Sequence, residues 1–146
     1  MLGLGDLNLM SGRQDAAQKY YDLAWTGAQH LPLEHPIVVS FENPVKLPSF
    51  GFSVIREPLP SDGNFETIPV SLTIDETGRV KRVAREALID VTTAKTNRAR
   101  RIAKRARFRP AIDNGKLIAS QDFPYEVRIS VLRSKAKDDA DDNAAE

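Results

Sequence analysis

The 146-residue chain has no cysteine, only two histidines and no apolar run long enough to cross a bilayer. Without cysteine it forms neither a disulfide framework nor a thiolate metal site. Its apolar runs are far shorter than the roughly 18 to 20 residues of a spanning helix, and no basic and apolar leader follows Met1. We therefore expect no membrane span and no export signal within this sequence.

The few chemically reactive groups do not form a pattern typical of catalysis. His30 and His35 have only Glu34 beside them as a further ligand, so a metal set is incomplete. The sequence contains no Gly-rich phosphate loop, nucleophile elbow or zinc motif. We predict a protein that is not an enzyme and that binds no metal or other cofactor.

Apolar residues at helical spacing predict two helices between residues 2 and 29, joined by a turn at Gly12. The small and aromatic residues resemble a tetratricopeptide repeat over residues 1–30, with a generic helical hairpin as the alternative; they are Leu4-Gly5, Gly12, Ala17, Tyr21 and Ala24. A single repeat does not bury its apolar face alone. Residues 1–30 therefore either dock on the rest of the chain or end a longer array.

Residues 31–66 form a proline-rich segment, and seven of the nine prolines lie between Pro32 and Pro69. Each proline removes a backbone donor, so long regular elements are not expected there. The segment is too apolar for a free linker, and we predict a connector that packs on the core, with an edge strand at Phe50–Ile55. At the other end, residues 134–146 are small and charged and are predicted to be a disordered acidic tail.

Residues 67–133 carry the clearest strand and helix signals. Alternation over Val70–Ile74 and the turn Asp75–Gly78 predict a β-hairpin. The spacing of three between Val80 and Val83 breaks the alternation and predicts a bulge or a strong twist near Arg82. A helix is predicted over 93–107, capped by Thr92 or Thr93, with a narrow apolar stripe that suits docking on a sheet; the stripe is Ala99, Ile102, Ala103 and Ala106.

The helix must end where Pro110 follows, and Asn114-Gly115 supplies the two positive-φ residues of a tight hairpin turn. The final strand alternates best of all, with every second residue from Phe123 to Val131 apolar. The predicted fold class is therefore α+β: an N-terminal helical hairpin followed by a small antiparallel sheet packed against one helix.

This order of elements resembles the C-terminal domain of the TonB family over about residues 67–132. Two motifs at family-like separations carry the resemblance: Val70-x-Leu72-x-Ile74-Asp75-x-x-Gly78-x-Val80 and Arg107-Phe108-Arg109-Pro110-Ala111. With the repeat-like start, the chain looks like the end of a tetratricopeptide-repeat protein that carries a TonB-like domain.

The resemblance implies a non-enzymatic protein-binding or scaffolding module of the bacterial cell envelope, periplasmic and part of a longer exported protein. Its partner would be an envelope protein or peptide that adds a strand beside the last strand. The implied partner-binding residues are Tyr125, Glu126, Val127, Arg128, Ile129 and Ser130. Alternatively, residues 31–69 or a second copy in a homodimer cover this strand, and the module is then a scaffold.

A basic face on the predicted helix 93–107 offers a different function. Arg100, Arg101, Lys104 and Arg105 are suited to phosphates, anionic lipid headgroups or carboxylate polymers. The alternative function is thus a nucleic-acid or anionic-polymer binder. Nucleic acid is the less favoured partner because no aromatic residues alternate with the basic ones and the net charge is only +1.

Overall fold

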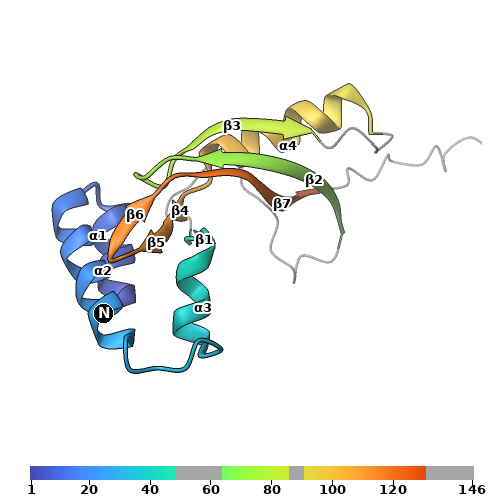
Figure 1. Cartoon of the computed structure of the whole chain (residues 1–146). Helices are drawn as coiled ribbons and strands as arrows, with labels where there is room; N and C mark the ends of the chain where they lie inside the picture. Colours follow the sequence, from blue (N-terminus) through green and yellow to red (C-terminus); the bar gives the residue numbers. More distant parts are fainter. Residues whose placement is uncertain (49–63, 86–90, 131–146) are drawn as a thin grey trace, which may run out of the picture.

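The computed structural model describes residues 1–48, 64–85 and 91–130, which form a mixed α+β fold. Its helices are α1 (Leu2–Met10), α2 (Gln14–Ala28), α3 (Pro36–Glu42) and α4 (Thr93–Arg105). Its strands are β1 (Val45–Lys46), β2 (Phe65–Ile74), β3 (Val80–Arg85), β4 (Phe108–Arg109), β5 (Ala111–Asp113), β6 (Lys116–Ile118) and β7 (Ser120–Ser130). Figure 1 shows α1, α2 and α3 gathered at one end, with a curved sheet and α4 at the other. No helix in the described ranges is long and apolar enough to span a membrane.

The two predicted N-terminal helices are confirmed as α1 and α2, which pack against each other as a hairpin. Gly12, at φ 75°, takes the left-handed conformation that the turn between them needs. Gly5 lets the helices approach closely, because a Cβ at this position would overlap the ring of the fully buried Tyr21. Gly5 and Tyr21 therefore fit together at the contact between α1 and α2.

Helix α3 lies within the proline-rich connector, where no helix was predicted. Pro36 stands in its first turn, where a missing N–H has no consequence. The His35 side chain caps the helix by accepting from the Ile37 N–H at 3.2 Å, and Phe41 packs on Trp25 at 5.4 Å between ring centroids. The predicted edge strand at Phe50–Ile55 and the predicted disordered tail, 134–146, lie outside the described residues.

A three-stranded antiparallel sheet has the order β3-β2-β7. Thr73 pairs with Arg82 but Ile74 pairs with Val80, so Lys81 is an extra residue and the predicted bulge is confirmed. β7 has a second bulge at the same level of the sheet, where Asp122 adopts a φ of 52°. Bulges bend a sheet and increase its twist, in line with the curvature visible in Figure 1.

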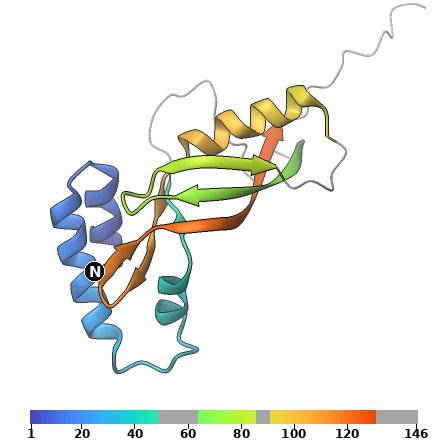
Figure 2. The ribbon, with the colours of Figure 1, turned by 45° about the horizontal axis from the view of Figure 1, so that its top comes forward.

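Helix α4 covers one face of this sheet, and Figure 2 shows it running alongside β3. Thr92 caps it by accepting from the Lys95 N–H at 3.4 Å, and the helix ends at Arg105 rather than at the expected residue 107. It ends there because Ala106 is extended, with φ −64° and ψ 144°. The predicted apolar stripe is confirmed as part of a core with the inward residues of the sheet and Phe108: Ile68, Val70, Leu72, Ile74, Val80, Ala99, Ile102, Ala103, Ala106, Val127 and Ile129.

Residues 108–118 join the sheet to the helical hairpin. The predicted turn is confirmed, with Asn114 at φ 49° and Gly115 at φ 77°. Arg109 is buried and pairs with Asp6 of α1 at 3.1 Å, and the Tyr21 hydroxyl donates to the same carboxylate at 2.8 Å. The helical hairpin therefore docks on the rest of the chain through this segment, around a second core of Leu9, Ala17, Tyr21, Ala24, Ala28, Phe41, Leu47 and Ile112.

Candidate functional site

Strand β7 lies at one edge of the three-stranded sheet. Its pairing with β2 runs from Phe65↔Ser130 to Ile74↔Ser120, and within the described residues β2 is the only strand that pairs with it. Beyond the bulge at Asp122, the register is regular from Phe123 to Ser130. An edge strand presents unpaired backbone N–H and C=O groups on one side, so this stretch is suited to pairing with another strand.

The six predicted partner-binding residues divide between the two faces of β7. Val127 and Ile129 are buried against α4, and Tyr125 is half-buried with its ring edge-on to Phe108 at 5.4 Å between centroids. Glu126, Arg128 and Ser130 alternate with them and lie on the opposite face. Only the side chains of the opposite face are available to a partner, and the residues that face α4 contribute their backbone groups.

Cation–π contacts fix two side chains along this edge. The Arg128 guanidinium lies 5.9 Å from the centre of the Phe65 ring, and the Lys46 ammonium lies 5.8 Å from that of Tyr125. Such contacts contribute about 0.5–1 kcal/mol at exposed sites. Arg128 is thereby held over the outer face of β2, and Lys46 brings β1 close to β7.

Residues 31–48 of the connector do not pair with β7. Strand β1 instead pairs with β4, with Val45 opposite Arg109 and Lys46 opposite Phe108. Phe65 and Glu66, placed at the end of the connector by the sequence, belong to β2. Residues 31–48 therefore do not form the covering strand that the sequence left open as an alternative.

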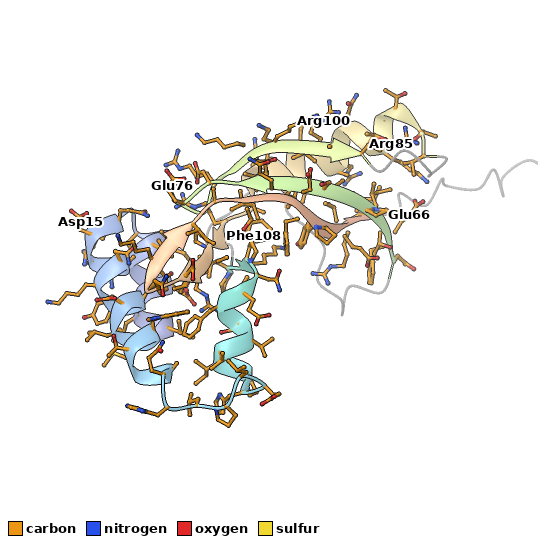
Figure 3. All side chains as sticks on the ribbon, viewed as in Figure 1. Asp15, Glu66, Glu76, Arg85, Arg100 and Phe108 are labelled. Carbon is orange, nitrogen blue, oxygen red and sulfur yellow. The ribbon has the colours of Figure 1, made fainter. Side chains whose placement is uncertain are left out.

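The predicted basic residues Arg100, Arg101, Lys104 and Arg105 are exposed on α4. The structure adds exposed basic residues from β3, which runs alongside the helix: Lys81, Arg82 and Arg85. Figure 3 labels Arg100 on α4 and Arg85 at the end of β3. The sequence pattern did not reveal this extension, because only the fold brings the basic residues of β3 beside those of α4.

A basic groove of about 420 Å³ lies between the start of β3 and the end of α4. It is lined by Arg79, Val80, Lys81, Lys104, Ala106 and Arg107, which include four cations and no carboxylate. The backbones of Arg79 and Arg107 form a β-bridge, so these two cations occupy adjacent chain segments. The groove therefore concentrates positive charge from two stretches of sequence, 79–81 and 104–107.

Hydrogen bonds hold the walls of the basic groove. The Lys104 ammonium donates to the Lys81 carbonyl at 2.6 Å, which ties α4 to β3. Arg107 Nη2 donates to the carbonyls of Leu9 and Thr77 at 3.4 and 3.3 Å. Arg107 Nε is buried and has no hydrogen-bond partner among the described residues. Burial, and then the positive charge of Arg79, lower the pKa of Arg107.

Asp75 is the carboxylate beside the groove. Burial acts to raise its pKa, but hydrogen bonds from the Thr77 hydroxyl, from the N–H groups of Arg79 and Thr77, and from Lys81 lower it overall. Its other oxygen lies 3.4 Å from the Lys81 ammonium, whose side chain is 64% exposed. Asp75 therefore serves mainly to hold the turn, and it offsets only one of the four cations.

The described residues contain no group of three or more histidine and acidic side chains placed to hold a metal ion. His30 follows α2 and His35 caps α3, the helix-end and loop positions expected for them. Comparison of the chain with family models, with curated proteins and with solved structures gave no match. The likenesses to a tetratricopeptide repeat and to the TonB C-terminal domain therefore stay predictions from the sequence.

Proposed function

We propose that this protein is a non-enzymatic protein-binding module that receives an extended peptide as an added strand beside β7. The observation that carries the proposal is the regular, eight-residue stretch Phe123–Ser130 at the edge of the sheet. A peptide strand would gain backbone hydrogen bonds along this edge. The resemblance to the TonB family adds the setting: the periplasm, an exported parent protein and an envelope protein as the partner.

The side chains of β7 favour a peptide with polar and charged residues at alternate positions. Glu126 and Ser130 are exposed, and Arg128 is held above Phe65 between them. A residue opposite Glu126 would gain from a positive charge. Specificity thus depends on side chains of the outer face, whereas affinity depends on the backbone of the edge.

The bulge at Asp122 sets one end of the proposed binding stretch. There the ladder shifts by one residue and the chain adopts a left-handed conformation. Bulges disturb regular strand pairing and commonly terminate it. A partner strand is therefore expected to run along 123–130 and to stop before 120–122.

The test is an NMR titration of the ¹⁵N-labelled full chain with eight-residue peptides from the periplasm-facing ends of outer-membrane receptors. The proposal expects shift changes along 123–130, weak salt dependence and slower exchange of alternate amides of β7. If every amide of 123–130 is already protected in the free protein, the strand is covered and the proposal is wrong.

A charge reversal on the outer face gives the matched control. Glu126→Lys is expected to weaken peptides that carry a basic residue opposite position 126 and to strengthen those with an acidic one. Glu34→Lys makes the same charge change at an exposed loop position and is expected to leave both affinities unchanged. Equal effects of the two variants would refute recognition at β7.

A further inference from the structure

The basic groove differs from the rest of the basic surface in how its charges are held. Exposed cations on one helix face are surrounded by water and are not held in one position by a partner. In the groove, however, Lys104 is tied to a backbone carbonyl and Arg107 is anchored by two. Lys104 and Arg107 are therefore held beside one space of about 420 Å³, which Arg79 and Lys81 also line.

The arginine side chains in the groove keep unmet hydrogen-bonding capacity. Arg107 Nε has no partner among the described residues, although a buried donor without a partner is unfavourable. Arg79 has its backbone N–H engaged with Asp75, and its exposed side chain lies close enough to Arg107 to lower the pKa of that group. An anion between the two guanidinium groups would relieve their repulsion and accept their hydrogen bonds.

The end of α4 and the Asp75 carboxylate are both unfavourable to an anion in such a site. A helix C-terminus carries a partial negative charge of roughly half an elementary charge, confined to its last turn. Lys104 and Arg105 stand in that turn and offset it. Four positive charges line the groove and the Asp75 carboxylate offsets one of them, so the balance favours an anion.

We infer that the groove formed by Arg79, Lys81, Lys104 and Arg107 binds a phosphate group. Arginine forks suit tetrahedral oxyanions with several acceptor oxygens, and lysine adds a point charge. The volume exceeds that of one phosphate, so the group belongs either to a short phosphate chain in solution or to a phospholipid headgroup. This site is separate from the edge of β7 that we propose for peptides.

The first experiment is calorimetric titration of the full chain with inorganic phosphate and with tripolyphosphate, at constant ionic strength set with chloride. Vesicles of phosphatidylglycerol, with phosphatidylcholine vesicles as the blank, distinguish a headgroup from a soluble phosphate. Saturable binding of any phosphate probe with one site per chain is the expected result. Absence of binding to all of them would overturn the inference.

Paired charge variants locate the bound group. Arg79→Gln with Lys104→Gln removes two groove cations and is expected to weaken phosphate binding by about tenfold or more, because charge-assisted hydrogen bonds are lost. Arg100→Gln with Arg101→Gln removes the same charge from the outer face of α4 and is expected to change it less than about twofold. All four residues are exposed, and circular dichroism checks that both variants keep the fold.

The two pairs also separate a phosphate site from diffuse attraction. If both variants weaken phosphate binding equally and the affinity falls steeply with salt, the basic residues attract phosphate only through their summed electrostatic field, and the inference is wrong. Tight binding of a short oligonucleotide that depends on Arg100 and Arg101 would also contradict the inference and would indicate a nucleic-acid interface on the outer face of α4. Peptide binding at β7 is unaffected by either variant, so the two proposals fail independently.

Discussion

Neutralising Asp6 is expected to destabilise the protein by about 2 to 3 kcal/mol, because it leaves the buried Arg109 guanidinium without its counter-ion. Arg109 is the one charged residue among the buried side chains of the described core, and only 7% of its side chain is exposed. Its Nη1 lies 3.1 and 3.4 Å from the two Asp6 oxygens. Breaking a fully buried pair costs about 3–5 kcal/mol, and the 20% exposure of Asp6 reduces that figure.

The assay is urea unfolding of Asp6→Asn, Arg109→Met and the double variant, followed by circular dichroism. Because Arg109→Met removes the buried charge, the double variant should be less destabilised than the sum of the single ones, with a coupling of about 1–2 kcal/mol. Glu66→Gln is the matched control, since Glu66 pairs with Lys95 at 2.7 Å but both side chains are well exposed. Such a pair contributes about 0–1 kcal/mol.

Additive effects, or an Asp6→Asn variant no less stable than Glu66→Gln, would refute the reasoning. The helical hairpin would then dock on the rest of the chain without a contribution from this ion pair. A large coupling would show instead that the pair fixes how α1 sits on residues 108–118.

Three further predictions concern Tyr21, Asp75 and Gly115. Burial, and then the charge of Asp6, raise the pKa of Tyr21 in the folded protein. The stability that the protonated hydroxyl contributes should therefore be complete below the ordinary tyrosine pKa of about 10 and fall as the pH rises above it. Urea titrations should show a weaker pH dependence of the free energy of unfolding in Tyr21→Phe. The pKa of Asp75 is lowered in the folded protein, so its contribution to the free energy of unfolding should be complete above the ordinary aspartate pKa of about 4 and be lost on acidification. The Asp75→Asn variant should lose less stability than the parent over the same acid range. Gly115→Val should lower the melting temperature strongly, because the residue has φ 77° and its Cβ would overlap the Asp22 carboxylate, whereas Arg105→Ala should melt like the parent. A Gly115→Val protein as stable as the parent would contradict the placement of the turn.

Local sequence signals predicted most of the sheet and α4. The Asn114-Gly115 turn, the alternation of β7 and the stripe on α4 each depend on residues close in sequence. The bulge at Lys81 was also predictable, since a break in strand periodicity leaves a mark in the sequence. These features are set by backbone preference and by which face must be buried.

Other features depend on contacts between distant segments, and the sequence did not predict them. Nothing near Arg109 in the sequence marks it as buried, because its partner lies on α1. Helix α3 was missed because proline counts against helices everywhere except in the first turn, where Pro36 stands. The basic groove was missed for a related reason: Arg79 and Lys81 lie far from Lys104 and Arg107 in the sequence, and the β-bridge between Arg79 and Arg107 brings the two segments together.

The position of β2 between β3 and β7 has a consequence for how the chain reaches its fold. The β2–β3 hairpin closes through a turn of a few residues, but pairing Phe65 with Ser130 closes a much longer loop that includes α4 and residues 108–118. Contacts between residues far apart in sequence form slowly, because closing a long loop is entropically unfavourable. We therefore expect β7 to join the sheet last, and pulse-labelled hydrogen exchange should protect 70–85 before 123–130. During synthesis, the side of β2 that later holds β7 therefore stays open until β7 has emerged, and we expect another strand to be able to pair with it in that interval.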